Sequence, residues 1–497
     1  MRLAISTVAL ISAFCAVGSV AAPVTAATPG AGLALVGRNS LGNRGMNAAL
    51  AVADHCAYVG SRNDAAPQVI DITAPANPKV VGSLTAHTGS TPRELRTVPA
   101  LHELAVLFYK LNGGVNGVDL YRWRSSCESP SVVGHYDFGG AAPHEFFLWQ
   151  DPARPARVLL FVSMFATSPD ELQVVDITNP ASPAKLGGWA VPPGYGHAPL
   201  HSIALAPDGR TAYVSLWTGG LIVADTSDFV TGKANPVLRP LTPAGSAFKT
   251  ASGNVHSAVP WPGQSSVLTT DERYPSPFGA GCPFGSAHVV DVADPSHPVP
   301  LSTLSIPENQ PAACPANPRA TWTSHNPTLT AHLALLTWYS AGLQVFALDD
   351  PARPVRVAEY RASGVNPARR DLQLGDTDTM SWSYPVIARG LIYLADINQG
   401  LLVLRYAGPH QDELTGLSFA EGNSNLGASS SAPVASPSPS TAGPAPSVSP
   451  GPTAVPPAPA PRQGGFTTAA SAGAAVLLLA IGLFVVRTRR RAAAISR

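Results

Sequence analysis

Residues 174–183, VVDITNPASP, carry the pattern that decides the fold of this chain. A short apolar run ends in aspartate, and a turn with the spacing x-x-P-x-x-P leads into the next apolar run. The pattern returns at 69–78 (VIDITAPANP), 289–298 (VVDVADPSHP) and 345–354 (VFALDDPARP). Looser copies begin near residues 118, 221 and 401. A repeat of about 50–65 residues is typical of the blades of a propeller.

Each copy follows two further short apolar segments, such as 201–209 (HSIALAPDG) and 211–217 (TAYVSLW). Four short strands per unit predict an all-β fold, a seven-bladed β-propeller over residues 32–408. The seventh copy stops early, and residues 33–38 (LALVGR) match the missing strand. We therefore expect this N-terminal strand to close the ring and remove an exposed strand edge. Six or eight blades are alternatives, because the loops around Cys282 and Asn366 are long.

These units resemble the LVIVD repeat of secreted or membrane-anchored actinobacterial propellers, a repeat named for its apolar strand ending in aspartate. The resemblance covers nearly all of residues 32–408. It implies a surface or secreted β-propeller without implying one chemistry. The chain is also distantly similar to the selenium-binding protein and methanethiol oxidase propellers, which use histidines for copper.

Both ends of the chain predict export and anchoring. Residues 1–26 have the charge, apolar run and small-residue cleavage site of a signal peptide. Residues 416–465 are rich in Ala, Pro, Ser and Thr, which predicts a disordered stalk. Residues 467–486 lack charge and are long enough for a transmembrane helix, and the basic tail 487–497 favours the cytoplasm. The expected location is the cell membrane, with a single pass and the propeller outside.

Two alternatives concern the ends: an uncleaved N-terminal anchor, and a C-terminal sorting signal, for which the sequence has no LPxTG-type motif. Removal of residues 1–26 leaves Cys56, Cys127, Cys282 and Cys314. An even number outside the cell indicates two disulfides with three possible pairings. Because Cys282 and Cys314 flank one long insertion, we favour Cys282–Cys314 with Cys56–Cys127 over free buried thiols.

Histidine opens the first expected strand of four consecutive blades, at His144, His201, His256 and His325. Because first strands line the central channel of a propeller, four imidazoles should face the same space. Neutral imidazole suits transition metals, so the hypothesis is a copper or zinc site. The alternative is a set of histidines that bond to neighbouring loops and ordered water. The equivalent positions of the other blades hold Asn47, Arg93 and Trp382, and we name Arg93 and Trp382 as accessory candidates.

Acidic residues form a second group of candidates, with Asp271 and Glu272 ending a strand of blade five. Asp376 and Asp378 precede the last blade. These carboxylates could be oxygen ligands or general acids and bases, and the alternative is loop capping or pairing with arginine. His197 lies in a Gly/Pro-rich loop, where helical ligand spacing does not apply. Other expectations are that aspartates of the repeat accept turn hydrogen bonds and that aromatic residues shape a pocket or the core: Asp71, Asp176, Asp291, Trp338, Tyr339, Tyr384.

Two functions from different classes are consistent with these features. The first is a cell-surface interaction module, with an extracellular protein, glycan or small ligand as its partner and the membrane as its anchor. The second is a metal-dependent extracellular enzyme, such as an oxidoreductase, that uses copper or zinc at the histidines. A net charge of +1 gives no basic surface for nucleic acid. The sequence also lacks the G-x-S-x-G, Walker A, H-E-x-x-H and EF-hand motifs.

Overall fold

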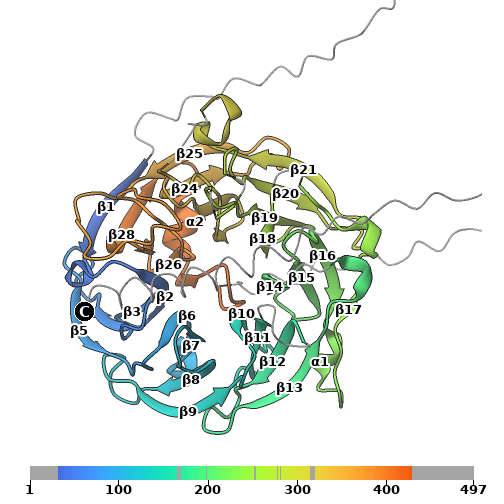
Figure 1. The fold of residues 1–497 in the computed structure, drawn as a ribbon, viewed down its shortest axis with the longest axis horizontal. Helices are drawn as coiled ribbons and strands as arrows, with labels where there is room; N and C mark the ends of the chain where they lie inside the picture. The colour runs from blue at the N-terminus through green and yellow to red at the C-terminus, as the bar shows by residue number, and fades with distance from the viewer. Residues whose placement is uncertain are drawn as a thin grey trace, which may run out of the picture. The chain divides into compact units, whose positions relative to one another are not determined.

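The structure, a computed structural model, describes residues 32–427 except 165–169, 197–198, 251–252, 277, 280 and 314–318. Within these ranges the strands form seven antiparallel sheets arranged as blades around a common axis (Figure 1). The chain is a seven-bladed β-propeller, which confirms the predicted fold class and blade number.

Strands are numbered along the chain, and the first strand of a blade lies nearest the axis. Blade 1 contains β2 (Asn47–Ala53), β3 (Cys56–Ser61), β4 (Gln68–Asp71) and β5 (Lys79–Ser83). Blade 2 contains β6 (Ser90–Val98), β7 (Glu103–Lys110), β8 (Gly117–Arg122) and β9 (Ser131–Asp137). Blade 3 contains β10 (Pro143–Gln150), β11 (Val158–Met164), β12 (Leu172–Asp176) and β13 (Ala184–Trp189).

The remaining blades follow the same order, except that blade 7 has five strands. Blade 4 contains β14 (Ser202–Leu205), β15 (Thr211–Ser215), β16 (Leu221–Asp225) and β17 (Arg239–Pro240). Blade 5 contains β18 (Val255–Pro260), β19 (Ser266–Asp271), β20 (Ala287–Asp291) and β21 (Val299–Leu304). Blade 6 contains β22 (Pro327–Leu329), β23 (Leu333–Thr337), β24 (Leu343–Ala347) and β25 (Val355–Tyr360). Blade 7 contains β29 (Phe419–Ala420), β26 (Val386–Ala388), β27 (Leu391–Asp396), β28 (Gly400–Ala407) and β1 (Gly32–Asn39).

The loops carry only short helices in the described residues. The α-helices are α1 (Ser227–Thr231) and α2 (Gln411–Gly416). The 3-10 helices are η1 (Leu41–Asn43), η2 (Pro99–Leu101), η3 (Pro193–Tyr195), η4 (Ala244–Ser246), η5 (Pro307–Asn309) and η6 (Pro311–Ala313). None of the described helices has the length and apolar character to cross a membrane, and the expected span 467–486 lies outside the described residues.

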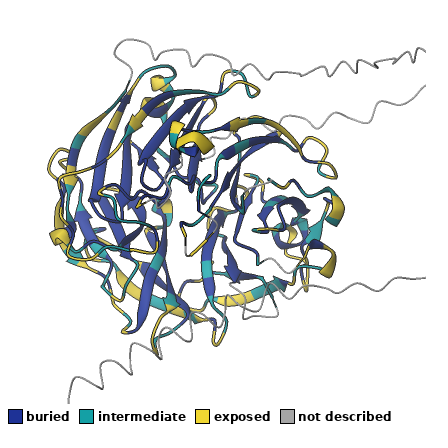
Figure 2. Cartoon of the chain, turned by 45° about the horizontal axis from the view of Figure 1, so that its top comes forward, coloured by how far each residue is buried: buried dark blue, intermediate teal, exposed yellow. Residues whose placement is uncertain are grey.

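Burial of both faces explains why the inner strands read as continuous apolar runs. Strands β11 and β27 are buried at every residue, whereas β5 and β9 face solvent at most of theirs (Figure 2). Indole N–H groups also join blades: Trp149 donates to Pro207 O at 3.2 Å, and Trp261 donates to Ala331 O at 2.8 Å. The apolar faces between blades therefore supply the core.

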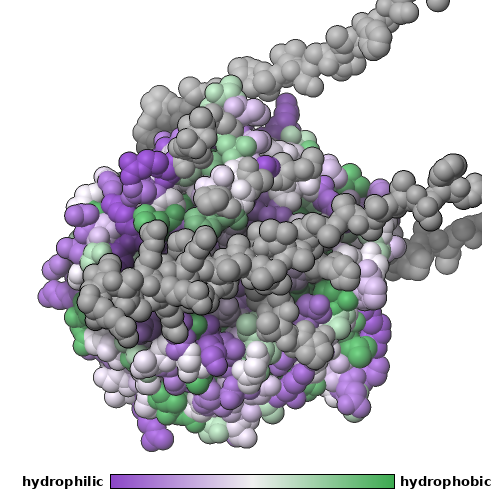
Figure 3. Space-filling view, in the orientation of Figure 1, coloured by the Kyte–Doolittle hydropathy of each residue, from purple (hydrophilic) through white to green (hydrophobic). Residues whose placement is uncertain are grey.

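The face drawn in Figure 3 shows no broad area of one character among its coloured atoms. In Figure 3 hydrophilic and hydrophobic residues are interspersed over the coloured atoms of this face. Several of the exposed large apolar side chains lie on the outermost strands, among them Val80, Val132 and Leu301. Single exposed apolar residues of this kind are normal on a soluble surface.

The aspartates of the repeat act as turn acceptors, as expected. Asp71 Oδ1 accepts the backbone N–H of Thr73 at 2.8 Å. Asp176 Oδ1 accepts the backbone N–H of Thr178 at 2.8 Å, and Asp291 Oδ1 accepts that of Ala293 at 2.9 Å. These carboxylates hold the turn that leads to the outermost strand, and they lie away from the axis.

The N-terminal strand closes the ring. β1 pairs antiparallel with β28, from Gly32 opposite Ala407 to Asn39 opposite Leu401. The seventh blade thus combines both ends of the repeat domain, which confirms the predicted closure.

One of the two expected disulfides lies within the described residues. Cys56 on β3 is bonded to Cys127 in the loop after β8, so the bridge links blades 1 and 2 across 71 residues of sequence. Cys282 is also disulfide-bonded. Its expected partner, Cys314, lies outside the described residues, so the Cys282–Cys314 pairing stays a prediction.

The segment after blade 7 corrects the predicted start of the stalk at residue 416. Residues 417–427, here called the strap, pair with blade 7 through β29 and then run to blade 3 (Figure 1). There the Leu148 N–H donates to Asn423 O at 3.1 Å. Asn425 Nδ2 donates to Gln150 O at 2.8 Å, which ties the strap to β10. The propeller therefore extends beyond residue 408, because polar groups of the strap find partners on inner strands.

A glycine lets the strap pass close to the inner strands. A Cβ at Gly422 would lie 1.8 Å from Pro327 O and 2.7 Å from Tyr384 Cδ1. We expect Gly422→Ala to lower the free energy of unfolding by about 1–3 kcal/mol, because the strap must shift to relieve these contacts. Denaturant unfolding would measure the loss, and hydrogen exchange at Leu148 and Asn425 would locate it.

Gly416→Ala is the matched control, because a Cβ at Gly416 has no atom within 4 Å. Equal stability of the two variants, with unchanged exchange at Leu148, would contradict the role given to Gly422.

Candidate metal centre

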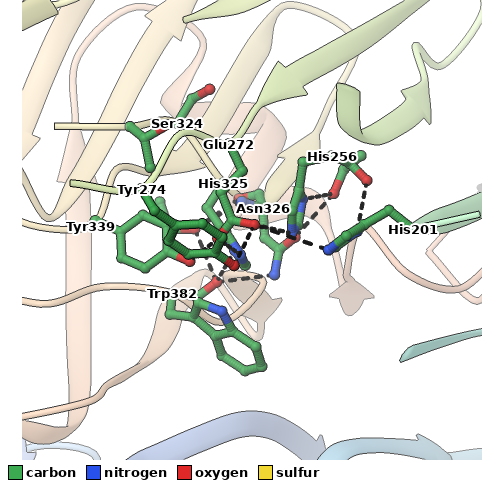
Figure 4. A network of polar contacts seen from close by, with 12 residues as sticks. His201, His256, Glu272, Tyr274, Ser324, His325, Asn326, Tyr339 and Trp382 are labelled. Carbon is green, nitrogen blue, oxygen red and sulfur yellow. Dashed lines mark hydrogen bonds and ion pairs between the residues drawn. The ribbon is translucent and has the colours of Figure 1, made fainter. Parts of the chain in front are cut away.

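The four histidines predicted to meet at the axis do so. His144 lies in β10, His256 lies in β18, and His201 and His325 come just before β14 and β22. Successive imidazole rings are in contact, with centroids 4.3 Å apart for His144–His201, 4.0 Å for His201–His256 and 3.9 Å for His256–His325. We call these four residues with Glu272 the central cluster, of which Figure 4 labels His201, His256, His325 and Glu272.

Backbone irregularities aim these side chains inward. The pairing of β10 with β11 skips His144, between Pro143 and Glu145, and the pairing of β18 with β19 skips His256. A β-bulge of this kind re-aims a side chain away from the regular ladder. The pairing of β6 with β7 skips Arg93 in the same way. The register thus supports the equivalence of Arg93 with the histidines.

The Nε2 atoms of His144 and His201 meet, and ligand atoms of His256, Glu272 and His325 lie within 4.8 Å of one another. His144 Nε2 and His201 Nε2 lie 2.9 Å apart. Metal–nitrogen bonds of about 2.0–2.1 Å place two ligand nitrogens roughly 3 Å apart. The spacing of this pair therefore suits two ligands of one ion.

Glu272 brings a carboxylate to the same space, although the strand β19 ends one residue earlier. Its Oε2 lies 4.0 Å from His201 Nε2 and 3.9 Å from His256 Nε2, and its Oε1 lies 3.4 Å from His325 Nε2. Tyr274 donates a hydrogen bond to Glu272 at 2.9 Å, and the Tyr339 hydroxyl donates to it as well (Figure 4). Both hydroxyls hold the carboxylate towards the imidazoles.

Hydrogen bonds at Nδ1 fix the orientation of two rings. His201 Nδ1 lies 3.2 Å from His256 O, and His325 Nδ1 lies 2.8 Å from Trp382 O. Since a carbonyl can only accept, each Nδ1 carries the proton. The Nε2 of each neutral ring then presents a lone pair, as in histidine ligands held by outer-shell acceptors.

A longer chain of bonds orients His256. Asn326 Nδ2 donates to Trp382 O at 3.0 Å, which turns its Oδ1 towards Ser257. The Ser257 hydroxyl donates to Asn326 Oδ1 at 3.1 Å and so accepts from His256 Nδ1 at 2.7 Å. His256 therefore also presents an unprotonated Nε2.

Burial keeps the imidazoles neutral. Desolvation lowers the pKa of His201 to about 3, and it holds the pKa values of His144 and His256 well below their usual range. The pKa of His325 is lowered for the same reason, against the opposing effect of Glu272. Neutral imidazole is the form that binds a metal ion.

Glu272 differs from the histidines in keeping its charge. Burial would raise the pKa of its carboxyl, but the hydrogen bond with His325 and the charges of His325 and His201, which these rings carry once they are protonated at low pH, lower it to about 2. An ionised carboxylate among neutral imidazoles provides a mixed nitrogen and oxygen donor set, which zinc and copper accept.

A second buried layer lies beside the central cluster. Glu145 comes within 4.8 Å of ring nitrogens of His201 and His256. Burial and then the charge of Glu94 raise the pKa of Glu145 to about 8. Glu94 itself pairs with the buried Arg96 at 3.1 Å, and the sequence reasoning missed this layer. The signal available for finding this layer was the presence of charged residues inside the inner strands β6 and β10.

Two aromatic residues at the site have left-handed backbones, Trp217 with φ 47° and Tyr339 with φ 31°. Trp217 stacks on His201 with centroids 4.8 Å apart, and Tyr339 meets the ring of His325 edge-on at 4.8 Å. Non-glycine residues in this region carry strain that clusters at functional sites. Tyr339, expected to shape a pocket or the core, is buried in the core, whereas Trp217 was not predicted.

Several other candidates serve elsewhere. The Asp271 carboxylate contacts His288 Nε2 at 3.2 Å instead of the central cluster, although Glu272 is the next residue. Arg370 pairs with Asp378 at 2.9 Å and lies 3.8 Å from Asp376, so these carboxylates form the expected pairs with arginine.

The remaining candidates are settled by burial or lie outside the description. Asn47 is buried and donates to Ile397 O at 3.1 Å, which joins blades 1 and 7. Trp338 and Tyr384 are buried in the core, and His197 lies outside the described residues.

Histidine also meets carboxylates away from the axis. His87 and His135 contact Asp119 at 2.8 and 2.6 Å. His332 and His410 lie beside Glu413. These groups are partly exposed, so they serve as comparisons for the buried cluster.

A cavity of about 620 Å³ lies where the inner strands end, on the side away from the histidines. Its walls combine the ends of β14, β18 and β22 with the strap. Apolar and aromatic residues on these walls include Phe147, Leu205 and Trp261. A cavity of this size suits a small organic molecule.

The LVIVD repeat family model matches residues 44–86 and 166–189. The first range includes all of blade 1, and the second includes β12 and β13, so the chain carries LVIVD repeats. No curated protein matches the chain.

Solved structures with a similar fold are propellers of low sequence identity. The C-terminal WD40 domain of Sif2 has a TM-score of 0.47 and 11% identity, and the match covers 76% of this chain and 99% of that one. Sqt1 from Chaetomium thermophilum, bound to the N-terminus of ribosomal protein L10, has a TM-score of 0.46 and 14% identity over 73% of this chain and 97% of that one. A Lactobacillus plantarum protein has a TM-score of 0.43 and 11% identity over 63% of this chain and 86% of that one. These likenesses say nothing about the function of this chain.

Proposed function

We propose that this propeller of LVIVD repeats binds a transition metal ion, copper or zinc, at its central cluster. The ligands are His201, His256 and His325, with His144 and Glu272 completing the donor set. The observation that carries the proposal is the convergence of Nε2 atoms whose Nδ1 partners leave them unprotonated. Removal of the buried imidazoles from water calls for a compensating partner, and a metal ion supplies one.

The activity class is a metal-dependent extracellular enzyme, with oxidoreduction as the chemistry if the ion is copper. A bound ion would supply Lewis acidity or electron transfer. The residues of the chain hold the reacting groups in place: Trp217 and Tyr339 pack against the imidazoles, and Tyr274 holds Glu272. Glu145 holds a proton close to His201 and His256 at neutral pH, because burial raises its pKa to about 8.

The purified chain should contain or take up stoichiometric copper or zinc. His256→Ala should remove a central ligand and weaken binding by more than the 10–100-fold typical of an outer-shell change. Elemental analysis and competition with a chelating dye would measure content and affinity, and circular dichroism would confirm folding. His297→Ala is the control, because His297 is exposed and outside the cluster.

Two results would overturn the metal proposal. One is a folded wild-type chain that neither contains nor takes up metal. The other is metal content that survives His256→Ala but is lost in His87→Ala, which would place the ion at Asp119.

A cell-surface binding module is the second candidate function, and the cavity of about 620 Å³ favours it. The cavity is built independently of the central cluster, so a small extracellular ligand could bind without the metal. A glycan or protein could approach the same side of the ring.

Ala331→Trp should fill this cavity, because Ala331 is an exposed residue on its wall. A ligand found by thermal-shift screening of sugars and small organic acids should stabilise the wild type and fail to stabilise the variant. The metal-binding variant His256→Ala should keep the effect. Stabilisation that persists in Ala331→Trp, or an absence of any such ligand, would count against the module.

The proposed location is the outer face of the cell membrane, and the support comes from the sequence at 1–26, 428–465 and 467–486. Protease treatment of intact cells should release or degrade the propeller, because it lies outside the membrane. Immunoblotting of cells and supernatant measures this, with a cytoplasmic protein as the control. A propeller that resists protease until the cells are lysed would show the opposite location.

A further inference from the structure

Arg93 lies at the same structural position as two of the histidines. Bulges in β6, β10 and β18 release Arg93, His144 and His256 from the strand pairing. A bulge turns each side chain towards the axis in the same sense. In blade 2, next to the four blades that carry the histidines, the guanidinium of Arg93 therefore takes the place of an imidazole.

The guanidinium of Arg93 makes no hydrogen bond or ion pair with any described residue, and its Nε is shielded from solvent without a partner. Neighbouring arginines are different. Arg62 pairs with Asp371 at 2.7 Å, and Arg96 pairs with Glu94 at 3.1 Å. A buried Nε–H group without an acceptor is costly unless a ligand supplies one.

Trp382 supports the guanidinium from one side. The Arg93 Cζ lies 5.4 Å from the centre of the indole ring, and the same ring lies 5.3 Å from the imidazole of His325. Stacking on an aromatic face leaves the N–H groups at the edge of a guanidinium free to donate. Arg93 is thus held beside the central cluster with its donors available.

The charges near Arg93 favour an anion. Glu272 brings one carboxylate to the cluster, and the charge of a divalent ion would outweigh it. The site would then carry excess positive charge next to an unpaired guanidinium.

We propose that Arg93 is the recognition residue for an oxyanion, a carboxylate or a tetrahedral oxyanion such as sulfate or phosphate, that binds beside the central cluster. The planar guanidinium of arginine can donate paired N–H hydrogen bonds to a planar carboxylate or to a tetrahedral oxyanion. The inference rests on the proposed function in taking this anion as the substrate or co-ligand of the metal centre. It does not need the metal for the anion site itself.

The test titrates the metal-free chain and the zinc-treated chain with acetate, sulfate and phosphate by calorimetry. Acetamide serves as the uncharged analogue of acetate. Arg93→Met keeps the length of the side chain and removes its charge, and it should weaken binding of the preferred anion about 10-fold or more. Arg93→Lys keeps the charge without the planar fork, so its anion affinity should lie between those of the wild type and Arg93→Met. This variant also provides the test if Arg93→Met does not fold.

Arg361→Met is the matched control. Arg361 also lies over an indole, with its Cζ 5.5 Å from the ring of Trp322, but it pairs with Glu308 and lies outside the cluster. Anion affinity should be unchanged in this variant.

The outcomes separate this inference from the metal proposal. Arg93-dependent anion binding to a chain that takes up no metal would uphold the anion site and overturn the metal centre. Metal uptake with anion affinity equal in the wild type and both Arg93 variants would overturn the anion site. Acetamide binding as tightly as acetate would overturn it too. Preference for acetate assigns a carboxylate ligand, and preference for sulfate or phosphate assigns a tetrahedral one.

Discussion

The pairing of β1 with β28 is the constraint on which the rest of this molecule depends. Each blade buries both faces against its neighbours, so an open ring would leave apolar faces and strand edges in water. Closure also sets the position of every inner strand relative to the axis. The imidazole rings from blades 3 to 6 stay in contact with one another only because the blades cannot spread apart.

Around the axis, the imidazoles and the Glu272 carboxylate are buried away from water. Hydrogen bonds to neighbouring groups offset only part of the free energy that this desolvation costs. The imidazoles stay neutral, with their Nδ1 protons bonded to Trp382 O, His256 O and Ser257. Glu272 accepts hydrogen bonds from the hydroxyls of Tyr274 and Tyr339. The arrangement holds lone pairs and one charge in a fixed geometry, and that rigidity is what a metal ligand set requires.

Much of the fold could be predicted from the sequence, because the repeat indicates both the order of the strands and the turns that follow the aspartates. The register of histidine at first strands also predicted that the four imidazoles meet, since repetition places equivalent residues at equivalent radii. Glu272 was separable from Asp271 only in three dimensions, because adjacent strand residues point to opposite faces. The strap was missed because its partners, such as Leu148, lie some 270 residues away in the chain. The composition of a segment does not predict which distant strand it will pair with. The buried layer of Glu94, Arg96 and Glu145 was missed because charged residues in a strand usually indicate solvent.

The bulges at Arg93, His144 and His256 have a consequence for how such a protein can change over evolutionary time. A residue excluded from the ladder contributes no cross-strand pair, so its replacement leaves the sheet hydrogen bonds intact. Mutation at these positions exchanges the chemistry at the axis while the folding energy of the blades is largely preserved. Blades built on one repeat thus offer a set of positions whose residues can differ one at a time, as Arg93 and His144 do.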